Sequence, residues 1–182
     1  MTLSFRPLGL AVLLLVLVLP MRASALGFEP SAWAGGPRLW VGNLNGTAAV
    51  GAQAERGFTK PGQYGPGFIS GGVGADYYSW SYDYAFGGSY DYSVIPIQVF
   101  SNYHLVFQNQ GKWDPYAGLS LVYSVVSASW DGPSTVSASA SDSSFDIAAQ
   151  LGTRYFIKPN FAAQAQIGVG YGTLGLGATW VF

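Results

Sequence analysis

Residues 145–157 read FDIAAQLGTRYFI, and this stretch decides the fold class. Its odd positions are apolar apart from one threonine, whereas Asp146, Gln150 and Arg154 all fall on even positions. Successive side chains of a strand point to opposite faces, so this alternation predicts a long β-strand with one apolar face. No 3.6-residue helical stripe competes with it. The same period of two returns in residues 93–107, 117–127, 161–171 and 174–182.

Turn signals separate the alternating runs and divide the chain into eight predicted strands. Asn45-Gly46, for example, is a two-residue hairpin signal. In the first strand two pairs of residues, Leu39/Val41 and Trp40/Leu44, compete for the apolar face. The predicted strands span residues 37–44, 47–58, 67–82, 89–107, 115–130, 143–157, 160–171 and 173–182.

The N-terminal residues 1–25 have the pattern of a secretory signal peptide. An apolar run from Leu8 to Leu19 follows a single positive charge, and Ala23-Ser24-Ala25 is a small-residue cleavage site. A membrane anchor is the alternative, but a spanning helix needs about 20 apolar residues and this run is shorter. Cleavage after Ala25 would leave one domain, residues 26–182. Its six basic and nine acidic side chains give a net charge of −3.

The composition excludes several classes of protein. Only 9% of the residues are charged and 16% are aromatic, the reverse of a disordered chain. With no cysteine and one histidine, the chain can form neither a disulfide framework nor a cysteine-based zinc site. Eight basic against nine acidic residues leave no basic face for nucleic acid. We therefore expect no cofactor, no metal and no nucleic-acid partner.

The strands are long enough, and of the right polarity, to cross a membrane. A membrane-barrel strand needs about 9–11 residues, and several of the predicted runs exceed this. Aromatic residues stand at the ends of the apolar faces, as in the girdles of membrane barrels, while the other faces are small and polar. A soluble all-β fold is the alternative, but it needs a charged outer face that this chain cannot supply. Only a closed barrel satisfies the strand backbone in lipid, so we predict an all-β, eight-stranded, antiparallel up-and-down transmembrane β-barrel.

The C-terminal pattern Leu174-x-Leu176-x-Ala178-x-Trp180-x-Phe182 resembles the last strand of Gram-negative outer-membrane β-barrel proteins. The stretches 102–105 and 112–119 are similar to the small opacity and porin-like barrels. The resemblance implies a bacterial outer-membrane location, both termini in the periplasm, lipid as a partner, and recognition of Trp180 and Phe182 by the barrel-assembly machinery. That group includes adhesins and structural barrels, so the resemblance implies little about activity.

Polar residues on the inward face predict a network inside the barrel. An eight-stranded lumen is narrow enough to be filled by side chains, and charges buried there must pair. We expect Arg154 to bond Glu55 across the lumen, with His104 and Gln164 as neighbours. The alternatives are a narrow channel, or an envelope-lipid-modifying enzyme with His104 as its base. The predicted network consists of Glu55, Asp76, His104, Asp146, Arg154 and Gln164.

A near-repeat marks the candidate surface site. Ser81-Tyr82-Asp83-Tyr84 and Ser89-Tyr90-Asp91-Tyr92 flank a short Gly-containing turn, which predicts a hairpin with facing tyrosines. An aromatic membrane belt with a solvated tip is one interpretation. Because tyrosine offers contact area at low entropic cost, a binding site for an extracellular ligand or host surface is the other. The Ser-rich run 134–144 is predicted as a loop. With two long and two tight surface connections, the top of the barrel should be lopsided. We expect a non-enzymatic barrel with a structural or surface-interaction role. The candidate surface residues are Tyr82, Tyr84, Phe86, Tyr90 and Tyr92.

Overall fold

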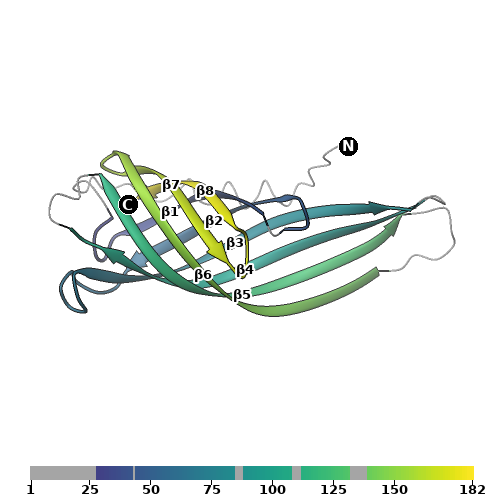
Figure 1. Cartoon of the computed structure of the whole chain (residues 1–182), viewed down its shortest axis with the longest axis horizontal. Helices are drawn as coiled ribbons and strands as arrows, with labels where there is room; N and C mark the ends of the chain where they lie inside the picture. The colour runs from purple at the N-terminus through teal and green to yellow at the C-terminus, as the bar shows by residue number, and fades with distance from the viewer. Residues whose placement is uncertain (1–27, 43, 85–87, 108–111, 132–138) are drawn as a thin grey trace.

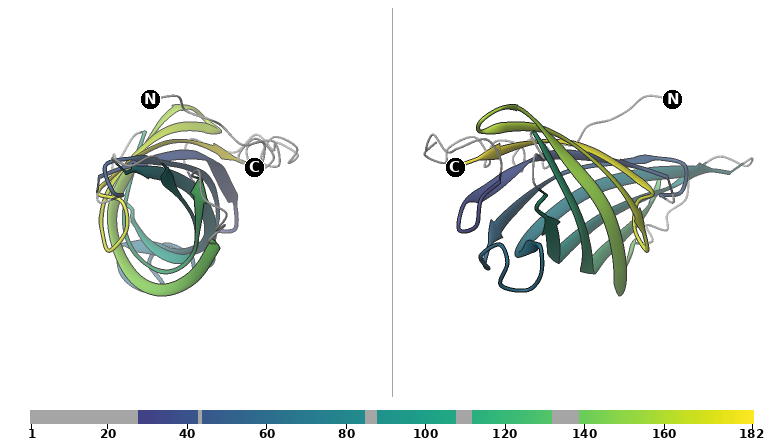
Figure 2. Two further views of the ribbon diagram at one scale, coloured as in Figure 1. Left: turned by 90° about the vertical axis from the view of Figure 1, so that its right-hand side faces the viewer. Right: turned by 60° about the vertical axis from the view of Figure 1, so that its left-hand side comes forward.

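The computed structural model describes residues 28–42, 44–84, 88–107, 112–131 and 139–182. Each strand pairs antiparallel with the next, and β8 pairs with β1, so the sheet closes into a barrel (Figures 1 and 2). No helix among the described residues has the length and apolar character to cross a membrane. The strands are β1 (Trp33–Val41), β2 (Ala48–Gly57), β3 (Gly67–Asp83), β4 (Ser89–Leu105), β5 (Trp113–Asp131), β6 (Ser139–Lys158), β7 (Phe161–Val169) and β8 (Leu174–Val181).

The prediction of an all-β, eight-stranded barrel is confirmed, but the starts of β1, β5 and β6 were wrong, and β5 begins at Trp113 rather than at residue 115. β1 begins at Trp33 rather than at residue 37, because its glycines belong to the strand. A Cβ on Gly36 would lie 1.9 Å from the carbonyl oxygen of Ala178, so glycine allows β8 to approach closely. β6 begins at Ser139 rather than at residue 143. Residues 139–144, predicted as loop, are strand paired with β5, and 134–138 lie outside the described residues.

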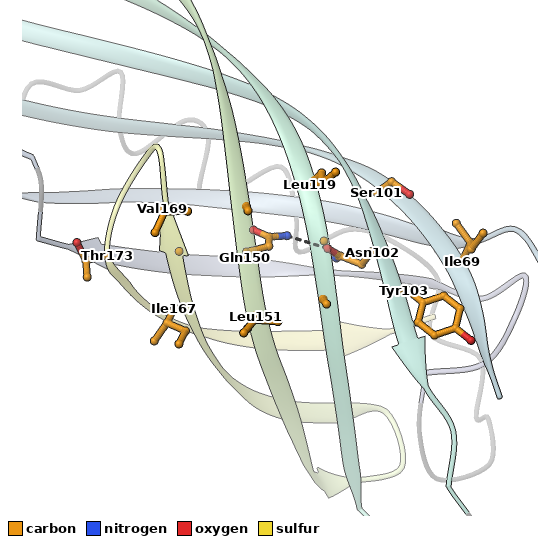
Figure 3. Close-up of a pocket in the computed structure, with 14 residues that line it drawn as sticks. Ile69, Ser101, Asn102, Tyr103, Leu119, Gln150, Leu151, Ile167, Val169 and Thr173 are labelled. Atoms are coloured by element: carbon orange, nitrogen blue, oxygen red, sulfur yellow. Dashed lines mark hydrogen bonds between the residues drawn. The ribbon is translucent and has the colours of Figure 1, made fainter. Parts of the chain in front are cut away.

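Large apolar side chains form a belt around the outside of the barrel. Eight large side chains on the apolar faces of the predicted strands are all exposed, from 46% for Ile97 to 73% for Ile147, so these faces lie on the exterior as a membrane barrel requires. Figure 3 shows part of this belt on β3–β7, where an apolar hollow of about 840 Å³ lies beside Leu119 and Ile167. A soluble protein rarely exposes such a surface. The eight exterior residues are Ile97, Val99, Leu119, Leu121, Ile147, Leu151, Ile167 and Leu176.

The strands are of unequal length, so one end of the barrel is extended. β3–β6 contain 17 to 20 residues, whereas β1, β2, β7 and β8 contain 8 to 10. Trp33, at the start of β1, and Phe182 lie side by side at the opposite end, which we call the terminal end. The long strands continue past the ring as a four-stranded sheet (Figure 1). This agrees with the prediction that the top of the barrel is lopsided. We call this sheet the extension; it comprises residues 78–83, 89–94, 126–131 and 139–142.

The extension rises beyond the apolar belt. On the outer face the large apolar side chains give way to serine and aspartate above Tyr77 on β3 and Val125 on β5. At about 3.3 Å per residue, its six-residue segments reach roughly 20 Å farther. β2 pairs with β3 only up to Tyr77, and β7 pairs with β6 only from Ala149, so both edges of the extension are open.

Candidate functional site

The lumen near the terminal end is crossed by an ion pair between opposite strands. Glu55 on β2 and Arg154 on β6 are 1% and 0% exposed, and Arg154 Nη2 donates to Glu55 Oε2. Arg154 Nη1 also donates to Asp114 on β5, at 3.3 Å. The guanidinium carbon also lies over the rings of Phe28 and Tyr116, 5.0 and 5.2 Å from their centres. The arginine is therefore held by two carboxylates and two aromatic faces.

His104 on β4 completes this cluster of charges. Its Nδ1 lies 2.7 Å from Asp114 Oδ1, and its Nε2 lies 2.9 Å from Glu55 Oε1. Ionised carboxylates only accept hydrogen bonds, so the ring satisfies both when it carries a proton on each nitrogen. Two carboxylates, one guanidinium and one imidazolium then balance in charge. Such balance is what allows ionic groups to be buried.

Ser70, His104 and Asp114 lie in a chain that looks like a catalytic triad. Ser70 Oγ is 3.0 Å from His104 Nε2, and His104 Nδ1 faces Asp114. A nucleophilic serine must give its proton to the imidazole, yet here Ser70 donates to Glu55 and the imidazole nitrogens face carboxylates. Ser70 is also 0% exposed, and Phe68 stacks on the histidine with ring centres 4.7 Å apart. The arrangement serves packing and hydrogen bonding and has no access for a substrate.

A second ion pair lies higher in the lumen. Arg38 on β1 donates to both carboxylate oxygens of Asp76 on β3, at 2.8 and 2.6 Å. Its remaining nitrogen donates to Gln53, which in turn donates to Gln164 on β7. Gln164 donates to the Tyr116 hydroxyl at 2.7 Å, beside the lower cluster. Glutamine side chains thus join the two ion pairs into one network from wall to wall.

Apolar clusters close the lumen above and below this network. The cluster at the extended end of the ring includes Tyr171, in the β7–β8 turn. Burial raises the pKa of the Tyr171 phenol, so this cluster carries no charge. At the terminal end the cluster consists of Phe28, Ala34, Phe68, Phe156, Ala162 and Val181. At the extended end of the ring it consists of Trp40, Leu44, Ala49, Val122, Ala148 and Tyr171, with Tyr78 against it.

The face of the extension that continues the lumen wall carries a cluster of aromatic rings. Trp80 stacks on Tyr92 across the β3–β4 pair, with ring centres 5.1 Å apart and planes at 6°. Tyr90 packs against Trp130 of β5 at 4.8 Å. Seven rings are linked in this way, and we call them the aromatic cluster: Tyr78, Trp80, Tyr82, Tyr84, Tyr90, Tyr92 and Trp130.

Solved structures show which known proteins share this architecture. No family model matches the sequence, and neither does a curated protein. The N-terminal β-barrel domain of OprF from Pseudomonas aeruginosa superposes with a TM-score of 0.58 and 15% identity, over 86% of this chain and 100% of that one. Ail from Yersinia pestis, solved with the heparin analogue sucrose octasulfate, has a TM-score of 0.51 and 15% identity, over 83% and 97%. Neisserial surface protein A has the same score and identity, over 83% and 96%.

The chain has the fold of the small outer-membrane β-barrels. This confirms the fold expected from the C-terminal resemblance. Together with the exposed apolar belt, it places the barrel in a bacterial outer membrane. The extended end then projects into water beyond the membrane.

The structure brings most of the predicted lumen residues of this outer-membrane barrel together, with one exception. Glu55, Arg154 and His104 are in direct contact, and Gln164 pairs with Arg154 across β6–β7. Asp76 is buried but belongs to the upper ion pair. Asp146 points to the same side yet is exposed, because β7 has already ended there and β6 has lost a neighbour. Its assignment to the buried network was wrong.

Sequence reasoning missed several partners in the barrel's network, among them one arginine and one aspartate. Arg38 was missed because the register of the first strand was undecided, and Asp114 because it was assigned to a turn rather than to β5. Ser70 and Tyr116 fall on the inward parity of their strands, and this signal could have identified them.

The predicted tyrosines of the outer-membrane barrel also lie together. Tyr82 and Tyr90 pair directly across the β3–β4 hairpin, and Tyr84 and Tyr92 join the same aromatic cluster. Phe86 lies outside the described residues. The tryptophans of the cluster were missed, although both share the tyrosines' parity.

Proposed function

We propose that this protein is a structural outer-membrane barrel with a closed lumen that interacts with ligands through its surface extension. The observation that carries the proposal is the continuation of β3–β6 beyond the apolar belt as a sheet with an aromatic cluster. A barrel that only spanned the membrane would need no such sheet. Tyrosine and tryptophan are the residues that most often provide rigid contact area in recognition sites.

The interior supports a closed barrel rather than a channel or an enzyme. The ionic groups of the lumen are paired, and apolar clusters lie at both ends of the polar network. The triad-like Ser70 is 0% exposed, and Phe68 stacks on the neighbouring His104. Lipid acyl chains are the partner proposed for the apolar belt and its hollow, and Trp180 and Phe182 are the proposed assembly signal. With the extension outside the cell, the terminal end of the barrel faces the periplasm.

Shortening the extension tests the surface role. Tyr78 pairs with Val94, and Val126 pairs with Asp142, so an Asn-Gly turn can replace the residues between each pair. Bacteria would produce the full or the shortened barrel at equal surface levels, checked by heat-modifiable gel mobility. We expect the shortened barrel to assemble, and the cells to lose retention on polysaccharide-coated or protein-coated surfaces severalfold. Equal retention of both strains would contradict the surface role.

A further inference from the structure

The outer face of the extension carries a regular array of hydroxyl groups. Strand register aligns two rows across all four strands, and each row has one residue from each strand. The array contains seven serines and one aspartate. The first row is Ser79, Ser93, Ser127 and Ser141, and the second is Ser81, Asp91, Ser129 and Ser139.

This array forms the wall of a polar hollow, which we call the serine groove. The hollow has a volume of about 660 Å³, within the range of roughly 300–1,000 Å³ found for small-molecule sites. All eight residues of the array line it, together with Tyr77 and the strand segments that run between the two rows. The groove therefore lies on the outer side, directly above the point where the apolar belt ends.

The polar groups of the groove are available to a ligand. Ser81 donates to Asp91 Oδ1 at 2.6 Å, but Asp91 Oδ2 has no hydrogen-bond partner among the described residues. The other six serine hydroxyls likewise make no side-chain hydrogen bond within the described part of the chain. Each hydroxyl can both donate and accept, and the carboxylate accepts.

The floor of the groove is held rigid from behind. Between the two rows lie Trp80 and Tyr92, whose rings stack on the opposite face of the sheet. The register of β3–β6 stays the same from the lumen to the tip, although the β3–β4 pairing is interrupted at Asp76 and Tyr77. A ligand would therefore meet a preorganised surface, which lowers the entropic cost of binding.

Charge restricts the chemistry of that ligand. Neither lysine nor arginine occurs in residues 61–111 or 113–153, whereas the extension holds Asp83, Asp91, Asp131 and Asp142. Phosphate or sulfate groups would be repelled and would find no basic partner. The groove offers hydroxyl groups, one carboxylate and the flanking Tyr77 ring. The hydroxyls and the carboxylate can hydrogen-bond a ligand that is rich in hydroxyls, and the Tyr77 ring can pack against its apolar ring faces.

We propose that the serine groove is a binding site for a neutral saccharide. The inference rests on the proposed surface role and adds the ligand class and the face that binds it. The position of the groove just above the belt fits two sources, the headgroup of a neutral glycolipid in the outer leaflet and a free oligosaccharide. Both present the same hydroxyl-rich rings.

The test uses the full mature chain in phosphatidylcholine nanodiscs. Calorimetry and saturation-transfer NMR would measure binding of maltotriose, lactose and chitobiose, with sucrose octasulfate as the anionic counterpart. Nanodiscs with and without monogalactosyl diacylglycerol would show whether a lipid headgroup occupies the site and competes with the free sugar. The test variant is Ser127→Val/Ser129→Val, since valine favours strands and keeps the sheet intact. The control is Ser143→Val, on the same outer face but outside the groove.

We expect a neutral sugar, free or as the lipid headgroup, to bind the wild type, while sucrose octasulfate does not. The double variant should bind about tenfold more weakly or worse, because it loses two central hydroxyls, and the control should bind normally. Absence of neutral-sugar binding in both arms, or equal binding by the double variant, would overturn the proposal. If those results came with lost retention in the strain that carries the shortened barrel, the surface role would stand and the saccharide site alone would fail.

Discussion

Replacing Glu55 by glutamine removes the central carboxylate of the lumen while keeping its shape. In the wild type, Glu55 Oε1 accepts from Asn102 at 2.9 Å and lies 2.9 Å from His104 Nε2, while Oε2 accepts from Arg154. The amide of glutamine can satisfy only one of these sides. Its NH₂ group must face either the Arg154 guanidinium or the donors on the other side.

The magnitude follows from the charges that remain. The four-charge cluster becomes net positive, with Asp114 as its only carboxylate, at 3.3 Å from Arg154. Breaking one half of a buried ion pair costs about 3–5 kcal/mol. Because Asp114 still holds the guanidinium, we expect the lower part of that range, a loss of about 3 kcal/mol in the free energy of unfolding.

Urea unfolding of the barrel in lipid vesicles, followed by heat-modifiable gel mobility, measures this loss. Glu29→Gln is the matched control, because Glu29 is exposed outside the strands and the chemical change is the same. The control should unfold like the wild type. If Glu55→Gln lowered the free energy of unfolding by less than about 1 kcal/mol, the cluster would not be the buried, charge-balanced unit described above.

Four further outcomes are expected. Gly88 has φ of +111°, and a Cβ there would lie 2.5 Å from the Trp130 ring, so Gly88→Val should increase protease cleavage at the hairpin tip while the barrel assembles; loss of assembly would contradict a surface position. Deleting Phe182 should reduce the amount of barrel in the outer-membrane fraction on immunoblots, and an unchanged amount would refute its role as an assembly signal. Planar bilayers containing the protein should show no ion-conducting steps, because the lumen is filled between two apolar clusters, and regular steps would show that it opens. A fluorophosphonate probe should leave Ser70 unlabelled in mass spectra, and labelling there would reveal an accessible nucleophile.

The sequence could predict the sidedness of the strands because a strand's side-chain period is two. Arg154 occupies an alternate position of its strand that faces the lumen. Its depth in the lumen follows from how many residues separate it from the end of the strand at the terminal side, and the same holds for Glu55. The pairing of the two residues could therefore be derived from strand ends and from the order of strands around an eight-stranded ring.

Other features depend on information that hydropathy does not carry. Leu39 and Trp40 are both apolar, so the register of β1 could not be decided, and Arg38 was missed with it. Serine shows no apolar alternation, and so the start of β6 at Ser139 could not be distinguished from a loop. The exposure of Asp146 depends on where its neighbour β7 ends, which is a property of the paired sheet rather than of β6 alone.

The constant register of β3–β6 has an evolutionary consequence. Alignment of the strands is fixed by the buried charges and the belt, far below the tip, so it does not depend on which side chains the tip displays. Outward-facing positions such as Ser127 and Ser129 can therefore change with little effect on folding. Selection by a host, a phage or a neighbouring cell could change the outward-facing side chains of the extension while the membrane-spanning barrel stays constant. Related chains should therefore diverge fastest at the outer face of the extension.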